Sequence, residues 1–149
     1  MSEKSTNAEI RVDVNYANDL ITDIFKAKSC NDHEARTIAQ RLSGSNLVGH
    51  DSHGIARVPR YVEWMERGWV FPNLKPEVVI DAGAMGCLDA KQGFGQVAGE
   101  YAVDDGITRA KKHGVSVVGL RNSGHLGRIG DWAERAADAG LISFHFVNV

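Results

Sequence analysis

The sequence predicts an α/β protein in which a helical region precedes the first part of a mainly parallel sheet. Two observations support this fold class. Apolar residues recur at three- and four-residue steps through residues 15–69, as in helices with one buried face. Short β-branched runs then alternate with helical stretches over residues 75–149, as in βαβ units. We therefore expect an N-terminal helical region at residues 1–74 and the start of an α/β domain at residues 75–149.

The first two helices follow a short strand that we expect at residues 10–14. The second helix begins after Asn31, whose side chain can accept a hydrogen bond from the first turn, and it runs through Leu47. Glu34 lies three positions after Asn31 and completes a pattern similar to a capping box. The first helix is expected at residues 15–27, because five apolar residues there share one face: Tyr16, Leu20, Ile21, Ile24 and Phe25.

A third helix is expected to begin near Pro59, because proline suits a first helical turn. Residues 52–57 then form an irregular start, and the prolines and Asn73 within residues 71–76 mark a connection. An apolar stripe predicts the buried face of this helix: Ile55, Val58, Val62, Met65 and Trp69. The opposite side carries four larger polar or aromatic residues: His53, Arg57, Tyr61 and Trp64.

The second region alternates strands with helices. A basic run followed by Gly114 is typical of a helix C-terminus, because cations favour the negative end of the helix dipole and glycine adopts left-handed conformations. The last strand has no further element to cover it, so we expect an incomplete sheet and a chain that is the first part of a larger protein. Strands are expected at residues 77–80, 85–88, 115–120 and 141–147, and helices at residues 97–113 and 129–139.

Composition favours small-molecule chemistry. The chain has 149 residues, of which 43% are hydrophobic and 24% charged, which is ordinary for one globular domain. The formal net charge is −2 and basic residues are interleaved with acidic ones, so we expect neither nucleic acid nor membrane as a partner. No apolar run is long enough for a membrane span, and residues 1–13 lack the apolar core of a signal peptide. Cys30 and Cys87 are isolated cysteines, as is usual in a reducing cytoplasm, and we expect a cytoplasmic protein.

Two polar clusters are candidates for chemistry. His125 lies in a glycine-rich segment, residues 121–127, directly after the strand at residues 115–120. Ligands of open α/β sheets bind beyond the carboxyl ends of strands, where an imidazole can accept or donate a proton near neutral pH. The second cluster consists of residues 50–54 with Arg57, whose guanidinium could bind the carboxylate of a 2-oxo or 2-hydroxy acid through two parallel hydrogen bonds. A surface cation is an equally good interpretation of Arg57 alone.

Other patterns have simpler interpretations. Gly93-Phe94-Gly95-Gln96-Val97-Ala98 matches a relaxed dinucleotide-binding motif, but the acidic residue expected about 20 positions later is missing, which favours a tight glycine turn packed under the next helix. His50 and His53 have the spacing of metal ligands, but no third ligand is evident and we expect no metal. Residues 51–53 contain the residue types of a hydrolytic triad, but sequence neighbours do not face one another. Tyr61 by itself suits a half-buried packing residue with a hydrated hydroxyl.

Three separated motifs follow one another along the chain: Asn46-Leu47-Val48-Gly49-His50-Asp51-Ser52-His53-Gly54-Ile55-x-Arg57, Gly93-Phe94-Gly95-Gln96, and Asn122-Ser123-x-His125-x-Gly127. In this order they resemble the malate/L-lactate dehydrogenase family, which is unrelated to the Rossmann-type lactate dehydrogenases. The resemblance covers residues 10–149 and less than half of a family member. The hydroxycarboxylate dehydrogenase B branch is the most similar, through the run His125-Leu126-Gly127-Arg128-Ile129-Gly130-x-Trp132-Ala133-Glu134.

The resemblance implies a cytoplasmic homodimer that uses NAD or NADP. Its α/β cofactor-binding domain would be of the non-Rossmann type, with the active site between domains and subunits, and only the first part of that domain would lie in this chain. The cofactor contacts are not identified by the motifs. The implied reaction is hydride transfer between NAD(P) and a 2-hydroxy or 2-oxo carboxylic acid, and we expect these 149 residues alone not to turn over.

The resemblance also implies roles for five residues. His125 matches the proton acceptor of the family, Ser52 and His53 match a polar pair beside the substrate, and Arg57 matches the substrate-carboxylate contact. Tyr61 matches an adjacent pocket residue. In reduction, a protonated His125 would donate its proton to the carbonyl oxygen while Ser52 and His53 supply further hydrogen bonds, and oxidation would run the same steps backward.

Two departures from the family pattern border His125. Gly124 occupies a position where many members carry asparagine, and Leu126 one where many carry phenylalanine. They leave the choice between malate, lactate, aromatic hydroxy acids and cyclic imines open. The alternative to an enzyme is a non-catalytic dimerisation or binding module in which the histidines are structural.

Overall fold

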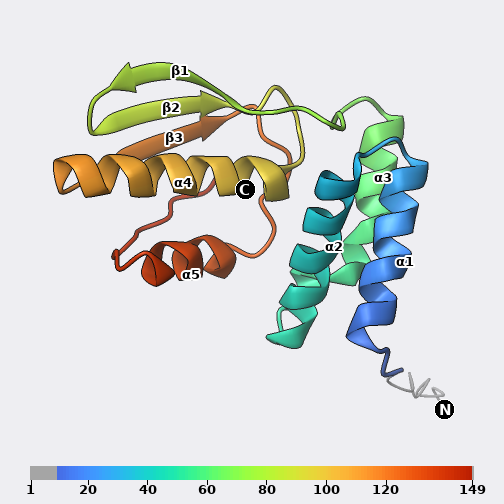
Figure 1. Cartoon of the computed structure of the whole chain (residues 1–149). Coiled ribbons are helices and arrows are strands. Elements are labelled where there is room, and N and C mark those ends of the chain that lie inside the picture. The colour runs from blue at the N-terminus through green and yellow to red at the C-terminus, as the bar shows by residue number, and fades with distance from the viewer. Residues whose placement is uncertain (1–9, 149) are drawn as a thin grey trace, which may run out of the picture.

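The computed structural model describes residues 10–148, which form two groups of elements (Figure 1). Helices α1, α2 and α3 pack together in one group, and a three-stranded sheet with α4 and α5 forms the other. The two groups touch where α2 meets α4. The predicted α/β fold class, with helices first and the sheet second, is confirmed. The helices are α1 (Val14–Ala27), α2 (Asp32–Leu47), α3 (Val58–Glu66), α4 (Gly95–His113) and α5 (Gly130–Asp138), and the strands are β1 (Glu77–Ala82), β2 (Met85–Asp89) and β3 (Val117–Arg121).

The start of α1 differs from the prediction, because residues 10–13 form no strand. The carboxylate of Asp13 accepts hydrogen bonds from the backbone N–H groups of Asn15 (2.9 Å) and Tyr16 (3.0 Å). The first N–H groups of a helix have no partner within the helix, so Asp13 acts as the cap of α1. The helix therefore begins at Val14, one residue before the predicted start. The predicted helix is therefore confirmed, and the strand predicted at residues 10–14 is wrong.

The cap of α2 is confirmed, but the capping box is not. Asn31 accepts a hydrogen bond from the N–H of Glu34 at 2.9 Å, as predicted. The carboxylate of Glu34 does not return to Asn31; it accepts from the N–H of Asn73 at 2.8 Å. The side chain of Asn73 instead accepts from the N–H of Asn31 at 2.7 Å. Asn73 thus fastens the connection after α3 to the start of α2, and Glu34 is buried beneath it.

Helix α3 packs Val58 and Met65 of the predicted stripe against the core, but its most deeply buried residue comes from the opposite side. It begins at Val58 with Pro59 in its first turn, after two 3₁₀ turns at Asp51–His53 and Ile55–Arg57, as expected. However, Tyr61 is its one fully buried residue, whereas Trp69 of the predicted stripe is 56% exposed. The aromatic rings of Phe25 and Phe94 pack around Tyr61 and draw that side of α3 into the core.

The sheet order is β1-β2-β3. β1 and β2 are antiparallel with an irregularity between Val78 and Ile80, and β2 and β3 are parallel. Helix α4 makes the crossover between β2 and β3 and covers one face of the sheet (Figure 1). Gly114 ends α4 with a φ of 82°, the left-handed conformation that the basic run and glycine predicted. Among residues 10–148, no helix has both the length and the apolar character that a membrane span requires.

The strand predicted at residues 141–147 is not formed in the described part of the chain. The alternation that suggested it is real: Leu141, Ser143 and His145 are half-buried, whereas Ile142 and Phe144 are 91% and 83% exposed. A strand also needs a neighbour for its backbone hydrogen bonds, and no strand among the described residues pairs with this segment. The alternation of residues therefore predicted which side chains of this segment are more buried, but it did not predict whether the segment pairs as a strand.

Prediction: the buried carboxyl of Glu34 makes stability depend on pH. Burial raises the pKa of Glu34 above 4.5, and one of its oxygens has no partner among the described residues. The folded protein therefore binds the Glu34 proton more tightly than the unfolded chain. This contribution to stability is complete below pH 4.5 and is lost as the pH rises through the folded pKa.

We expect Glu34→Gln to remove much of this dependence, so that the change in the free energy of unfolding caused by the substitution becomes more favourable as the pH rises from 4.5 to about 8. Urea denaturation at both pH values measures it. The exposed Glu66, changed to Gln, is the matched control. An equal effect of Glu34→Gln at the two pH values would contradict the burial argument.

Candidate active site

The structure brings His125 together with residues from the first half of the chain. His125 lies between β3 and α5, Ser52 and His53 lie in the first 3₁₀ turn, and Arg57 ends the second. The rings of His53 and His125 have centroids 5.0 Å apart. The hydroxyl of Tyr61, 64 positions earlier in the sequence, lies 2.8 Å from Nδ1 of His125. The two polar clusters expected from the sequence are therefore neighbours in space.

The two 3₁₀ turns are held in place by Asn46, at the end of α2. Its amide donates to the carboxylate of Asp51 (2.6 Å) and accepts from the N–H of Ile55 (2.8 Å). A side chain at Gly54 would come within 2.1 Å of the Asn46 amide oxygen, so any other residue there would displace Asn46 from these hydrogen bonds. Sequence reasoning gave Asn46 no role, although it is the first residue of the motif that ends at Arg57.

Ser52 and His53 form a pair within the first turn. The Ser52 hydroxyl lies 2.9 Å from Nδ1 of His53, and the ring of His50 contacts His53 edge-on at 4.4 Å between centroids. The pKa of His53 is lowered, by burial first and then by His50 and Arg57. Ser52 makes no hydrogen bond to His125 among the described residues; it reaches that ring only through His53.

Arg57 is positioned but not neutralised. Its Nε donates to the carbonyl of Ser52 at 2.6 Å. In residues 10–148, no carboxylate lies within ion-pair distance of Arg57, whereas Arg60 in the next turn pairs with Glu63 at 3.5 Å. Arg57 therefore keeps terminal guanidinium N–H groups that can bind an anion.

His125 is half-buried and carries an unusually low basicity. Burial is the largest cause, followed by the positive charge of Arg57 and the neighbouring His53, and together they lower the pKa of His125 to about 4. The N–H of Gly127 also points at Nδ1, at 3.2 Å. The free imidazole is thus neutral near pH 7, with Nδ1 already engaged by the protein.

The segment around His125 is anchored on both sides. The N–H of Gly124 donates to the carbonyl of Gly93 at 2.9 Å, and the indole of Trp132 in α5 donates to the carbonyl of Leu126 at 3.2 Å. A side chain at Gly95 would come within 2.3 Å of the carbonyl oxygens of residues 124 and 125. The glycine turn before α4 is therefore a site of close backbone contact, as the tight-turn interpretation predicted.

Two buried residues complete the surroundings of His125. Tyr61 is 1% exposed, which corrects the prediction of a half-buried residue with a hydrated hydroxyl. Burial raises its pKa to about 12. Its hydroxyl accepts a hydrogen bond from Nε2 of Gln96 at 2.6 Å. Sequence reasoning missed Gln96, and the only signal for it was its place in the Gly93-Phe94-Gly95-Gln96 turn.

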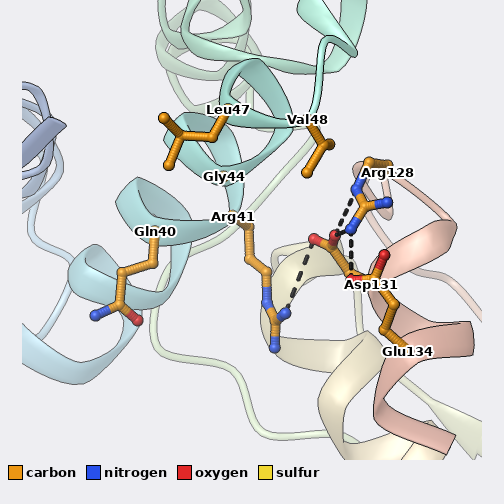
Figure 2. A pocket seen from close by; sticks show the side chains of 8 residues that line it. All are labelled: Gln40, Arg41, Gly44, Leu47, Val48, Arg128, Asp131 and Glu134. Atoms are coloured by element: carbon orange, nitrogen blue, oxygen red, sulfur yellow. Dashed lines mark hydrogen bonds and ion pairs between the residues drawn. The ribbon is translucent and has the colours of Figure 1, made fainter. Parts of the chain in front are cut away.

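A hollow of about 390 Å³ lies near this cluster, between α2 and α5, and none of the predicted site residues lines it (Figure 2). Its charged side chains neutralise one another: Arg128 pairs with Asp131 at 2.6 Å and with Glu134 at 2.7 Å, and Arg41 lies 3.8 Å from Asp131. These pairs tie the segment after His125 to α2 (Figure 2). The ion pairs that line the hollow thus hold the His125 segment in place, but the hollow contains none of the predicted site residues.

The sequence and the fold are both similar to those of known proteins. A profile of the malate/L-lactate dehydrogenase family matches residues 12–149. The chain belongs to this family. Hydroxycarboxylate dehydrogenase B of Escherichia coli K12 is 42% identical over 139 residues, which are 93% of this chain and 38% of that protein. L-lactate dehydrogenase of Cupriavidus necator is 34% identical over 140 residues, 94% of this chain and 40% of that protein.

Solved structures agree. Malate dehydrogenase of Pyrococcus horikoshii superposes with a TM-score of 0.84 at 32% identity, over 94% of this chain and 41% of that one. The resemblance inferred from the three motifs is thus confirmed, including its similarity to the hydroxycarboxylate dehydrogenase B branch. The chain spans about two-fifths of the length of these relatives, at 38% to 41%.

Prediction: Gly95→Ala should move the His125 segment. Its methyl group would occupy the place of the carbonyl oxygens of residues 124 and 125, so the segment must shift outward and hydrate. Hydration removes the main cause of the low pKa, and we expect the pKa of His125 to rise from about 4 toward 6.5.

An NMR titration of the His125 ring protons measures this pKa. Gly44→Ala is the matched control, because no atom lies within 4 Å of the added methyl group in α2. A His125 titration unchanged by Gly95→Ala would show that backbone contact at Gly95 does not control the ring.

Proposed function

We propose that this chain provides the carboxylate-binding and proton-transfer side of an NAD- or NADP-dependent 2-hydroxy acid dehydrogenase. The observation that carries the proposal is the meeting of His125 with His53 and Tyr61 from a distant segment, beside the guanidinium of Arg57, which has no carboxylate partner among the described residues. Structural histidines in a binding module would not need an unpaired cation beside them. The cluster therefore favours catalysis over the alternative of a dimerisation module.

Arg57 is proposed to bind the substrate carboxylate. Two guanidinium N–H groups match two carboxylate oxygens, and Arg57 has no internal carboxylate to compete among the described residues. This contact would direct the adjacent carbonyl or hydroxyl oxygen of the substrate toward His53 and His125, whose ring centroids are 5.0 Å apart. Ser52 is proposed to act through its contact with His53, which it orients.

His125 is proposed to hold and release the proton. When the 2-oxo acid is reduced, its oxygen becomes negatively charged, and the imidazolium form of His125 gives up a proton to it. A neutral ring would have to become an anion to do the same, so reduction requires the protonated ring. Oxidation requires the neutral ring with a free nitrogen. The low pKa of His125 favours the neutral ring in the free protein, and a bound carboxylate would favour protonation.

The hydride donor or acceptor is proposed to be a nicotinamide, which supplies or removes the hydride when bound. The glycine turn at residues 93–96 does not suit its phosphates, because the space beside Gly93 and Gly95 is filled by the chain's own backbone. None of the described residues is therefore assigned to hold the cofactor. What this chain would contribute is orientation of the acid and control of one proton.

Two further inferences follow from family membership. We infer that residues 1–74 carry the substrate side and that the α/β domain starting at residue 75 carries the hydride side. We also infer a cytoplasmic homodimer acting on a small 2-oxo or 2-hydroxy acid. Exposed apolar side chains on the helical group support a protein contact there, with Leu47 and Val48 at 71% and 58% exposure.

Substrate choice is proposed to depend on the residues beside His125. Relatives are named for hydroxycarboxylates, for L-lactate and for malate. The asparagine that many members carry at position 124 does not fit here without a shift, because a side chain on Gly124 would come within 2.9 Å of the carbonyl oxygen of Gly93.

Prediction: the chain should bind a 2-oxo acid through Arg57. Pyruvate or oxaloacetate added to the ¹⁵N-labelled chain should shift the ring signals of His53 and His125. We expect Arg57→Gln to weaken this binding by about tenfold or more, the equivalent of one charge-assisted hydrogen-bonded contact.

Arg60→Gln is the matched control, because Arg60 is exposed and already paired with Glu63. Equal binding by the Arg57→Gln and Arg60→Gln variants would exclude Arg57 as the carboxylate contact.

Prediction: His125 should be required for turnover. A hybrid in which this chain replaces the matching segment of the E. coli hydroxycarboxylate dehydrogenase B should oxidise reduced nicotinamide with 2-oxo acids. We expect His125→Asn to lower kcat by about 10²- to 10⁴-fold, the usual contribution of a general acid or base. Reduction should slow as the pH rises through the pKa of His125, and oxidation should slow as the pH falls through it.

His113→Asn, at the exposed end of α4, is the control for a histidine outside the site. Turnover by the His125→Asn hybrid at the unmodified rate would rule out the assigned role, whatever the substrate.

A further inference from the structure

Gln96 is a fully buried polar residue that the proposed function does not yet use. It lies in the first turn of α4, with none of its surface exposed. Its Nε2 donates to the hydroxyl of Tyr61 at 2.6 Å, and its Oε1 has no partner among the described residues. Buried amides are rarely left half-paired, so the position of this one calls for a physical reason.

The direction of the hydrogen bonds around Tyr61 follows from the atoms involved. The amide nitrogen of Gln96 can only donate, so the oxygen of Tyr61 accepts from it. The hydroxyl then has one hydrogen to donate, and Nδ1 of His125 lies 2.8 Å away. Gln96 therefore turns the hydrogen of Tyr61 toward Nδ1.

A second donor faces the same nitrogen independently. The backbone N–H of Gly127 lies 3.2 Å from Nδ1, and a backbone N–H cannot reverse its role. A hydrogen on Nδ1 would point at the hydrogens of the Tyr61 hydroxyl and the Gly127 N–H, which is unfavourable. Nδ1 is therefore an acceptor, and the proton of the neutral ring is on Nε2.

We propose that Gln96 is a positioning residue that, through Tyr61, keeps Nδ1 of His125 a hydrogen-bond acceptor and places the ring proton on Nε2. The proposal rests on the proposed role of His125 and adds which nitrogen meets the substrate oxygen. Nε2 has no hydrogen-bond partner among residues 10–148, so it is the nitrogen that can meet the substrate oxygen. When the imidazolium donates from Nε2 in reduction, the ring keeps its other hydrogen on Nδ1, and the Tyr61 oxygen must accept it until the resting tautomer is restored. Oxidation starts from that same Nδ1–H form, in which Nε2 is free to take the proton.

The amide of Gln96 also suits the other protonation state. When His125 becomes an imidazolium, Nδ1 carries a hydrogen and needs an acceptor, which the Tyr61 oxygen can provide. The hydroxyl hydrogen of Tyr61 must then point elsewhere, and rotation of the Gln96 amide brings the unpaired Oε1 toward it. Methionine could serve neither state, and a carboxylate would favour only the second.

The charged and titratable groups around His125 favour the neutral ring, whose tautomer Gln96 sets. Arg57 and His53 both oppose protonation of the ring. Tyr61 keeps its hydrogen, since burial raises its pKa to about 12. Removal of the Gln96 donor should therefore change the tautomer of the neutral ring without creating a tyrosinate.

The test is NMR of the imidazole ring nitrogens in the ¹⁵N-labelled chain, without substrate. At a pH where the ring is neutral, we expect Nδ1 of His125 to resonate as an unprotonated nitrogen and Nε2 as a protonated one. We expect Gln96→Met to shift the tautomer ratio toward Nδ1–H by about tenfold, the equivalent of one hydrogen bond. Gln96→Glu should raise the pKa of His125 by about 1 or more once the new carboxylate is ionised.

Gln92→Met and Gln92→Glu are the controls, since Gln92 is exposed and four positions earlier. A neutral wild-type ring with its proton on Nδ1 would overturn the proposal without any variant. Folded Gln96→Met and Gln96→Glu proteins with unchanged tautomer and pKa would overturn it as well, and Gln96→Glu keeps the side-chain shape if Gln96→Met does not fold. Because no substrate is present, these results do not depend on whether the chain binds a 2-oxo acid.

Discussion

The hydrogen bond between Tyr61 and His125 joins the two halves of the molecule at the point where chemistry is proposed. Tyr61 belongs to the aromatic core of the helical group, and His125 follows the last strand of the sheet. The aromatic core holds the Tyr61 ring in place, and the Tyr61 hydroxyl holds the edge of the His125 ring that carries Nδ1. The other contacts of the site depend on this one, because His53 and Arg57 are carried by turns that lead directly into the helix of Tyr61.

Local patterns were sufficient for most of the elements and for the meeting of the two clusters. The helix limits followed from apolar spacing, from the Asn31 cap and from Gly114, all of which act within one or two turns of backbone. The neighbourhood of His125 and His53 was expected from a general rule about where sheets bind ligands and from the family motifs. The sheet-edge rule and the family motifs both depend on residue types, which can be read directly from the sequence.

What the sequence could not provide were contacts whose partners are set only by packing. The buried state of Tyr61 depends on Phe25 and Phe94, and the use of Glu34 depends on Asn73, 39 positions away. Gln96 was interpreted only as part of the Gly93-Phe94-Gly95-Gln96 turn, because its partner is on α3. The strands expected at residues 10–14 and 141–147 were wrong for the same reason, since a strand is defined by a neighbour and not by its own residues.

The close approach of the glycine turn to the His125 segment links the evolutionary histories of three positions. Gly95 faces the backbone of Gly124, and Gly124 faces the backbone of Gly93 and Gly95, so a side chain gained at Gly95 or Gly124 requires the facing backbone to shift. Substitutions at these positions are then epistatic, and their effects on recognition of the acid would not add. A larger residue at position 124 would then require a compensating shift of the glycine turn, so its effect would depend on which residues the turn carries.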